Sequence, residues 1–289
     1  MGLVKRGFGW RMICPTVGKS PAFFISPVKK PRSPQVNICH GVHGPCPKMK
    51  LLTNAVSAPV IRLQDVRKEY VVGDSHIHAL DGVSLTVSPG EFVCISGRSG
   101  SGKSTMLNML AGLEKPTSGE IVILDKHIEN MSESARIRFR RQYIGFVFQS
   151  YNLMPQYTAV ENVELPLMLR GIGKRERRKQ ALAVMEQVGI VSHAEHKPSE
   201  LSGGQQQRVG IARALITKPP IVFADELTGN LDTKTSAEIM DLLTGLFRSS
   251  GTTFMLVSHD PDMSQYTDRT IHLLDGKIIS EETNQSVRR

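Results

Sequence analysis

The sequence predicts an α/β fold, in which a parallel sheet carries helices on both faces and a helical segment is inserted. Three continuous apolar runs, at residues 92–96, 221–224 and 253–257, have the length and composition of strands buried on both faces. Helical patterns lie between these runs, at residues 104–113, 181–188 and 205–217. Strands that alternate with helices in this way form parallel sheets.

Shorter elements flank this core. Residues 60–63 and 83–87 are expected to be strands, and turn residues separate them at Gly73-Asp74 and at Asp81-Gly82. Residues 88–91 (SPGE) form a further turn before the first buried strand. The stretch from about 150 to 198 has no strand pattern and is expected to be helical, with the charged run at 174–179 (KRERRK) on a solvated helix face.

The net charge of +9 is concentrated at the N-terminal end of the chain. Ten of the 36 Lys and Arg residues lie within residues 1–64, which contain no Asp or Glu, so the rest of the chain carries 26 basic against 27 acidic groups. A nearly neutral body excludes a basic surface for nucleic acid, and we expect no nucleic-acid partner. No apolar run reaches 18 residues, so a membrane part would have to come from another chain.

Residues 1–58 are rich in proline and show no helical or strand period, and we expect a disordered basic leader. Two interpretations are open: an organellar transit peptide, or an over-extended start with Met49 as the working start, which we favour. A single folded domain is expected over residues 59–283, with a short tail at 284–289. Cys94, on a predicted buried strand in that domain, is typical of a reducing compartment.

Residues 97–104 (GRSGSGKS) match the P-loop pattern between a predicted strand and a predicted helix. Glycines let the backbone curl so that successive N–H groups point at phosphate oxygens, and the helix start adds its positive dipole end. In such a loop Lys103 reaches the β- and γ-phosphates, and the Ser104 hydroxyl ligates Mg²⁺. The motif therefore predicts a nucleoside triphosphate site.

Two further strands end in residues suited to the same chemistry. Asp225 follows the apolar run at 221–224 and can hold Mg²⁺ through water, while Glu226 can orient and polarise the attacking water. His259 follows the third run, after Ser258, and is expected to contact the γ-phosphate. The carboxyl edge of a parallel sheet, where these residues meet the P-loop, is where ligands bind.

Residues 201–205 (LSGGQ) form a second helix start that is ready for an anion. Ser202 can cap the helix, and Gln205 three positions later completes a capping box. Gly203 and Gly204 allow backbone amides to approach an anion closely. One nucleotide needs a single cradle, so this second one is explained if two subunits pair head to tail, each offering this helix to the ATP of the other.

From about Val60 to Ile279 the sequence resembles the nucleotide-binding subunits of ATP-binding-cassette (ABC) transporters. The resemblance implies the ABC ATPase fold: a P-loop NTPase (RecA-like) core, a small antiparallel β subdomain, and a helical subdomain at about 150–215. It implies an ATPase that uses ATP and Mg²⁺ to power an integral membrane permease, working as a homodimer. The expected location is cytoplasmic, on the inner face of the cell membrane, or an organelle if the leader is a transit peptide.

The resemblance also implies roles for individual residues. The residues expected to bind ATP are Tyr70, Gly97, Arg98, Ser99, Gly100, Ser101, Gly102, Lys103, Ser104 and Thr105. The residues expected to act in catalysis are Lys103, Gln149, Glu226 and His259, and those expected to hold Mg²⁺ are Ser104, Gln149 and Asp225. The signature that contacts the partner's ATP comprises Leu201, Ser202, Gly203, Gly204 and Gln205, and Asp232 belongs to the D-loop.

Within the family, several stretches resemble the lipoprotein-release and macrolide-export branch. These are residues 78–85 (HALDGVSL), 144–150 (IGFVFQS), 161–166 (ENVELP) and 228–232 (TGNLD). Members of this branch serve different cargoes, and many transmit force to a permease with a large extracytoplasmic domain. One departure concerns Leu227, where the family has proline after the catalytic glutamate; we expect a looser turn there, with ATPase activity retained.

Two other functions are compatible with an ABC-type ATPase. The first is a soluble enzyme that acts on ribosomes or DNA, but this chain has one cassette. Leu201 follows Ser104 by 97 positions, and the segment between them carries no sustained heptads. The second is a cell-division motor that activates wall hydrolases through a related permease, which the sequence does not distinguish from transport.

Overall fold

The computed structural model describes residues 58–284, and the predicted leader and tail therefore lie almost entirely outside the described residues. Within this part of the chain, no helix combines the length and the apolar content needed to cross a membrane.

The centre of the fold is a six-stranded sheet in the order β10-β9-β3-β8-β7-β6. Its strands are parallel except for β10, which pairs antiparallel with β9. The bounds are β3 (Phe92–Ser96), β6 (Ile144–Val147), β7 (Ile221–Asp225), β8 (Thr253–Ser258), β9 (Arg269–Leu274) and β10 (Lys277–Thr283). The three predicted buried strands are confirmed as β3, β7 and β8, which lie side by side.

A second, antiparallel sheet has the order β2-β1-β4-β5. Its strands are β1 (Ile61–Val72), β2 (Ser75–Val87), β4 (Ser118–Ile123) and β5 (Lys126–His127). The turn predicted at Gly73-Asp74 joins β1 to β2, but the break predicted at Asp81-Gly82 is wrong, because β2 continues through it. The register shifts there, and Gly82 absorbs the shift with a φ of 78°, so the glycine marks a bulge.

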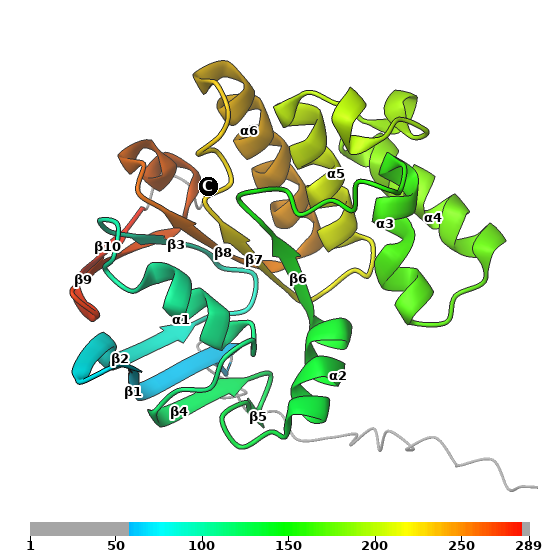
Figure 1. Cartoon of the computed structure of the whole chain (residues 1–289). Coiled ribbons are helices and arrows are strands. Elements are labelled where there is room, and N and C mark those ends of the chain that lie inside the picture. The colour runs from blue at the N-terminus through cyan, green and yellow to red at the C-terminus, as the bar shows by residue number, and fades with distance from the viewer. Residues whose placement is uncertain (1–57, 285–289) are drawn as a thin grey trace, which may run out of the picture. The chain divides into compact units, whose positions relative to one another are not determined.

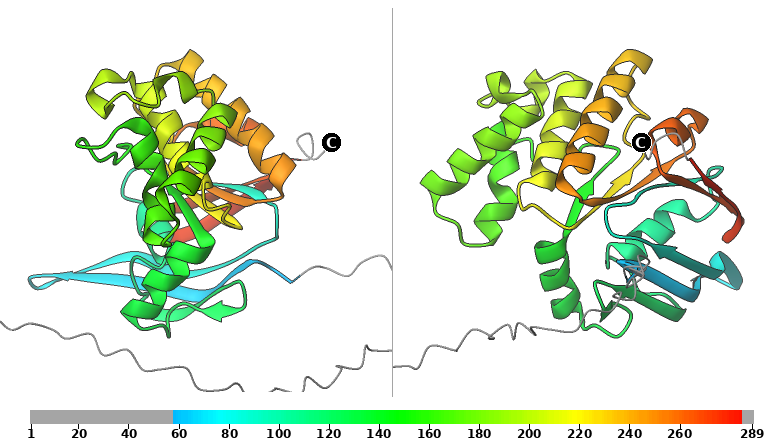
Figure 2. Two further views of the ribbon diagram at one scale, coloured as in Figure 1. Left: turned by 90° about the vertical axis from the view of Figure 1, so that its right-hand side faces the viewer. Right: turned by 180° about the vertical axis from the view of Figure 1, so that it is seen from behind.

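The helices are α1 (Lys103–Leu110), α2 (Glu133–Tyr143), α3 (Ala159–Leu169), α4 (Lys174–Gln187), α5 (Gly203–Leu215) and α6 (Thr233–Ser250). Short 3-10 turns are η1 (Val191–His193), η2 (Pro198–Glu200) and η3 (Pro261–Tyr266). Figure 1 shows α1 between the two sheets, while α3 to α6 gather on the other side of the central sheet. The views in Figure 2 show the same separation, with the β1–β2 hairpin extending from the antiparallel sheet.

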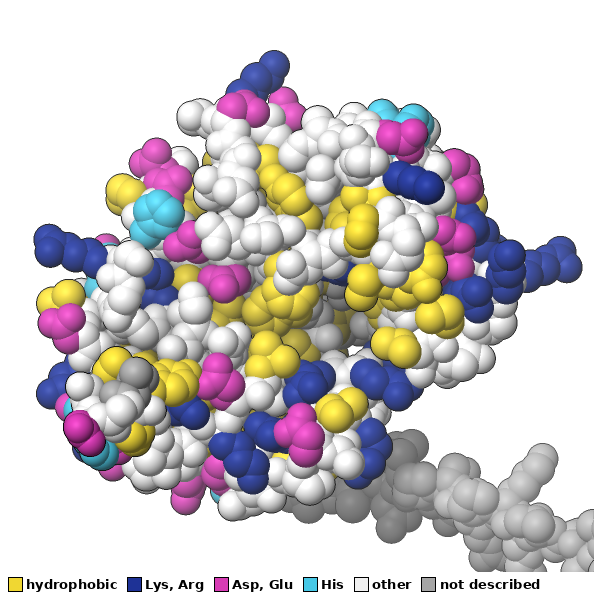
Figure 3. All heavy atoms as spheres, in the orientation of Figure 1, with side chains coloured by type: hydrophobic (Ala, Val, Ile, Leu, Met, Phe, Trp, Pro, Cys, Tyr) yellow, Lys and Arg dark blue, Asp and Glu magenta, His cyan; other side chains and the backbone are white. Residues whose placement is uncertain are grey.

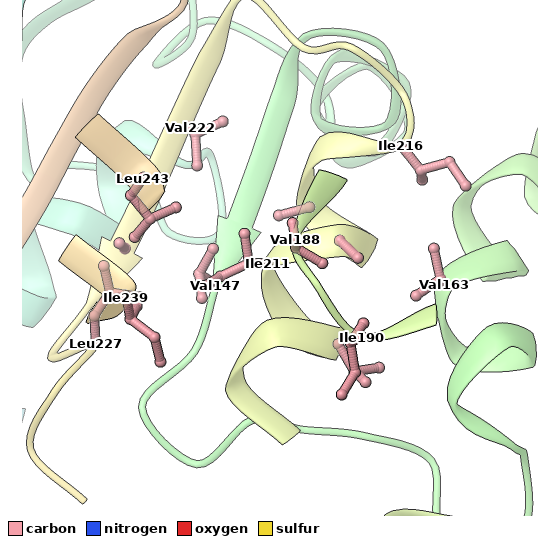
Figure 4. Close-up of a cluster of buried hydrophobic side chains, with 14 of the residues drawn as sticks. Val147, Val163, Val188, Ile190, Ile211, Ile216, Val222, Leu227, Ile239 and Leu243 are labelled. Carbon is pink, nitrogen blue, oxygen red and sulfur yellow. The ribbon is translucent and has the colours of Figure 1, made fainter. Parts of the chain in front are cut away.

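Two apolar clusters cover the two faces of the central sheet, because alternate residues of a strand point to opposite faces. In β3, Phe92 and Cys94 belong to the cluster under α5 and α6, whereas Val93 and Ile95 belong to the cluster around α1 and the antiparallel sheet. Figure 4 shows the first cluster, in which Leu227 lies beside Ile239 of α6. The sheet is therefore buried on both sides, as its continuous apolar strands predict.

The charged run at the start of α4 is only partly a solvated face. Glu164 of α3 is buried, and its two carboxylate oxygens lie 2.7 Å from Nε of Arg177 and 2.6 Å from Nε of Arg178. The interpretation of the whole run as solvated is thus wrong for these two arginines, because a buried carboxylate requires cationic partners. The pairs fasten α4 to α3.

Candidate functional site

The P-loop lies between β3 and α1, and other strands approach its backbone closely. A Cβ at Gly97 would lie 2.3 Å from the Leu273 carbonyl oxygen, and a Cβ at Gly102 would lie 2.2 Å from that of Ala79. Gly102 also has a φ of 100°, which disfavours other residues. The Gly276 N–H donates to the Ser101 carbonyl at 3.1 Å. Both sheets therefore fix the course of the loop.

Lys103 points back into this loop. Its Nζ donates to the carbonyl oxygens of Gly97 and Arg98, both at 2.8 Å, and the residue is 6% exposed. The Ser101 hydroxyl is buried and, among the described residues, has no hydrogen-bond partner. A buried ammonium bonded only to neutral carbonyls and a buried hydroxyl without a partner both fit a loop that takes up phosphate oxygens.

Ser104 and Asp225 meet at the end of β7, where the Ser104 Oγ donates to Asp225 Oδ1 at 3.4 Å. Burial raises the pKa of the Asp225 carboxyl, and the neighbouring charge of Glu226 raises it further, while Ser104 and Lys103 act against both. A hydroxyl and a carboxylate are ligands that Mg²⁺ prefers, with phosphate oxygens and water completing its six positions. This donor set fits a magnesium ion bound together with a nucleotide.

Glu226 is held from two sides. Its Oε2 accepts a hydrogen bond from Nε2 of Gln149 at 2.8 Å, and its Oε1 lies 3.1 Å from Nδ1 of His259. Its backbone has a φ of 42°, a left-handed conformation unusual for a residue with a side chain. A cavity of about 350 Å³ lined by Glu226, Gly229 and His259 adjoins the carboxylate. The structure thus gathers three of the predicted catalytic residues at one carboxylate.

Leu227 has a structural role that the sequence did not reveal. It is 2% exposed and packs into the cluster beneath α6, near Ile239 and Leu243 (Figure 4). Burial of a leucine side chain contributes on the order of 2 kcal/mol. The packing of Leu227 therefore restrains the turn, a contribution that the expectation of a looser turn, based on the missing proline, did not include.

The signature residues form the predicted capping box at the start of α5. The Ser202 Oγ accepts from the Gln205 N–H at 3.4 Å, and Gln205 Oε1 accepts from the Ser202 N–H at 2.8 Å. Leu201 is buried, and Ser202 is exposed. Among the described residues, no hydrogen bond or ion pair joins this box to the P-loop. The structure therefore leaves the two anion-ready helix starts unconnected within one chain.

Two other predicted residues are engaged elsewhere. The Tyr70 hydroxyl donates to Glu114 at 2.6 Å, and Nζ of Lys68 lies 4.9 Å from the centre of its ring. Burial, with the Glu114 carboxylate, raises the pKa of Tyr70. Asp232 caps α6 by accepting from the N–H and hydroxyl of Thr235, which lowers its pKa. The partners Lys68 and Glu114 belong to no motif, so sequence reasoning missed them.

Comparison with known proteins gives consistent matches. The profile of the ABC transporter family matches residues 80–229. The chain is 48% identical over 227 residues to the ABC transporter ATP-binding protein MJ0796 of Methanocaldococcus jannaschii, covering 77% of this chain and 97% of that protein. It is 43% identical over 230 residues to the macrolide export ATP-binding/permease protein MacB of Hyphomonas neptunium, covering 80% of this chain and 36% of that protein. The chain thus spans about a third of the length of this MacB relative.

Two solved structures extend the comparison to the fold. The dimeric post-hydrolysis state of the MJ0796 cassette, bound to ADP and Pi, has a TM-score of 0.73 at 46% identity, covering 77% of this chain and 98% of that one. CbiO1 of Clostridium perfringens, part of the ABC transporter complex cbiONQ, has a TM-score of 0.71 at 29% identity, covering 80% and 91%. The P-loop, the carboxylates at the sheet edge, the capped signature and these likenesses together establish that this chain belongs to the ABC transporter family, as an ATP-binding cassette of the ABC ATPase fold.

Proposed function

We propose that this chain is the ATP-hydrolysing motor of an ABC transporter, in which two copies pair head to tail around two ATP molecules and drive a separate membrane permease. The observation that carries the proposal is the division of the site. The P-loop and Glu226 form one half, and the signature, with Ser202 exposed, forms the second; among the described residues no hydrogen bond or ion pair joins the two. A head-to-tail pair completes both sites at once. The dimeric MJ0796 cassette is a precedent among relatives.

Binding begins at the P-loop. The phosphates replace the carbonyls of Gly97 and Arg98 as partners of Lys103, and the loop N–H groups and the start of α1 complete the cradle. Tyr70, fixed by Glu114, offers its ring to the adenine base. Mg²⁺ would be held by Ser104, Asp225 and Gln149, and would neutralise phosphate charge.

Hydrolysis centres on Glu226. Its carboxylate accepts a hydrogen bond from the attacking water and takes a proton as the water oxygen bonds to the γ-phosphorus. The bond from the γ-phosphorus to the oxygen that bridges to the β-phosphate breaks, so that ADP leaves, and the proton passes from Glu226 to the product phosphate or to solvent. Gln149 and His259 hold the carboxylate from both sides, and His259 reaches the γ-phosphate when the nucleotide is bound. Asp232, which caps α6, lies in the D-loop and contacts the partner subunit.

The permease is proposed to dock near Gln149 and α3. Apolar side chains gather on this side of the molecule in Figure 3, and Met154, Met168 and Leu169 are among the exposed large apolar residues. The cassette then lies at the inner face of the membrane. The similarity to MacB supports a permease of the macrolide-export or lipoprotein-release type, driven by transmitted force.

A Glu226→Gln variant tests the proposal. The amide oxygen can still accept from Gln149, and the amide NH₂ can donate to Nδ1 of a His259 that carries its ring proton on Nε2, but the amide cannot take a proton. Mg-ATP should therefore trap a stable dimer with turnover reduced at least about 100-fold. Size-exclusion chromatography with and without Mg-ATP measures the dimer. The matched control is the double variant with Lys103→Ala, which should stay monomeric. A monomeric Glu226→Gln chain under saturating ATP would contradict head-to-tail pairing.

A further inference from the structure

One side chain outside every recognised motif contacts the signature. Nε2 of His193, at the end of η1, lies 3.1 Å from Nε2 of Gln205. Gln205 is the residue whose other amide atom, Oε1, accepts the Ser202 N–H at 2.8 Å. The carboxamide therefore bridges His193 and the backbone that caps α5.

The bonding pattern fixes the protonation of His193. Because Oε1 of Gln205 accepts from an N–H, its Nε2 is the donor toward His193. Nε2 of His193 must then be the unprotonated acceptor, and the ring proton lies on Nδ1, which is 2.9 Å from the Ser192 hydroxyl. Only the neutral Nδ1–H tautomer satisfies both contacts.

The segment that carries His193 is anchored to the start of α3. The N–H of Ala159 donates to the His196 carbonyl at 2.8 Å, and the N–H of Val160 donates to the Ala194 carbonyl at 2.9 Å. These are first-turn amides of α3, which helical bonds leave free. The imidazole is thus presented to Gln205 from a fixed backbone rather than from a loose surface turn.

We propose that His193 is a positioning residue for the signature: its neutral imidazole holds the Gln205 carboxamide, and so keeps the start of α5 in the conformation that receives the partner's ATP. The part that concerns ATP rests on the proposed function. Protonation would place a ring N–H against the Gln205 NH₂ group. Turning the amide over would instead set that NH₂ against the Ser202 N–H, so one contact breaks in either case.

Several charged groups on the surrounding elements have partners of their own. Glu195 pairs with Arg178 of α4, and Arg208 of α5 pairs with Glu238 of α6. The Glu200 carboxylate accepts from the backbone N–H of Lys197 at 2.6 Å, and Lys197 itself is exposed. His196 is the titratable ring in contact, with its centre 5.2 Å from that of His193. His196 shares the environment of His193, but the ring that lies against the Gln205 carboxamide is that of His193, so His196 is the matched control.

The first test needs no nucleotide. In the ¹⁵N-histidine-labelled full chain, the signal missing from the His193→Gln variant identifies His193, and the Nδ1–H tautomer is expected at pH 8. Amide hydrogen exchange at residues 202–206 should accelerate about 3- to 10-fold in His193→Ala, from the loss of one hydrogen bond. His193→Gln, which retains an acceptor near the position of Nε2, and His196→Ala should remain within about 2-fold. An Nε2–H tautomer, or unchanged exchange in His193→Ala, overturns the proposal.

The second test adds the dimer. In the Glu226→Gln background with Mg-ATP, His193→Ala should raise the dimer Kd about 10-fold or more. Each of the two ATP sites of the dimer contains one signature, and both signatures lose the bond between His193 and Gln205. His193→Gln, which keeps an acceptor toward Gln205, should leave the dimer Kd within about 2-fold of the parent. An unchanged Kd in His193→Ala overturns the role at the interface. If the parent itself stays monomeric, the proposed function fails, and the first test still decides the His193–Gln205 contact.

Discussion

The P-loop and the signature are both glycine-containing helix starts, yet they are built differently. The P-loop is enclosed: strands of both sheets approach Gly97 and Gly102, and Lys103 is buried. The signature is supported from within, by the exchange of bonds between Ser202 and Gln205, and from one side, by His193. Ser202 itself is exposed.

The difference teaches how a site can be divided between two chains. A loop that binds its ligand without help from a second chain must be held in shape by its surroundings, and neighbouring strands enclose the P-loop in this way. A half-site that must meet a surface from another subunit needs a shape that persists while it faces solvent. A capping box supplies this with short-range bonds and leaves the outer side of the helix start open.

The largest effect is expected from a substitution in the P-loop, the enclosed half of the site. A Gly102→Ala Cβ would lie 2.2 Å from the Ala79 carbonyl oxygen at a φ of 100°, so the loop must shift, and ATP affinity should fall by at least about 100-fold. Titration with a fluorescent ATP analogue measures this. Gly100→Ala is the control, because its φ is 81° but its Cβ would meet open space, and about 10-fold is expected. An equal loss of ATP affinity in both variants would show that the close approach of the neighbouring strand at Gly102 has no effect on binding.

The next effect sharpens the contrast at the open half. Ser202→Asp keeps an N-cap of similar quality and suits the helix dipole, so the folded chain and its own ATP binding should be unchanged. In the proposed dimer the new charge would face the partner's triphosphate, so ATP-driven dimerisation in the Glu226→Gln background should weaken about 10- to 100-fold. Ser132→Asp, at the N-cap of α2, is the matched control and should dimerise normally. Normal dimerisation of both variants would place the partner's phosphates elsewhere.

The smallest effect concerns charge at the edge of the P-loop. Asp225 has a raised pKa, so the folded chain holds its proton more tightly than the unfolded chain, and this residue lowers stability as pH rises above the ordinary aspartate value through the raised one. Asp225→Asn should remove that part of the pH dependence and raise the free energy of unfolding near pH 7 by less than about 1 kcal/mol. Urea unfolding of the nucleotide-free chain at several pH values measures it. With Asp74→Asn in the exposed β1–β2 turn as control, an equal rise in both variants would contradict this assignment.

The sequence predicted those elements whose physics is local. A few consecutive residues are enough to predict the apolar strands β3, β7 and β8 and the capping box at Ser202. All of these are present in the structure. β4, β5, β6, β9 and β10 were missed. β5 and β6 have only two and four residues, and β4, β9 and β10 mix polar and apolar residues, so no continuous apolar run marks them. The glycine at 82 predicted a turn, whereas pairing with β1 on the same sheet turned it into a bulge.

The parts of the site that could not be predicted depend on contacts between distant positions. Glu164 gives no hint of its arginine partners until α3 and α4 pack together. The bond between Tyr70 and Glu114 spans 44 positions, and that between Gln149 and Glu226 spans 77. The predicted strand ends placed Glu226 and His259 at one edge of the sheet, and the family resemblance added Gln149. Only the folded chain shows that Gln149 and His259 both contact the Glu226 carboxylate.

The burial of Leu227 makes the alignment of the turn after Glu226 sensitive to temperature. A proline stiffens its turn through covalent geometry, which heat does not weaken. Leu227 stiffens the same turn by packing beneath α6, so the turn is firm only while α6 stays docked. Local undocking of a helix takes less free energy than global unfolding. Turnover by this cassette should therefore decline on heating before the chain melts, because the carboxylate beside Leu227 loses its alignment first.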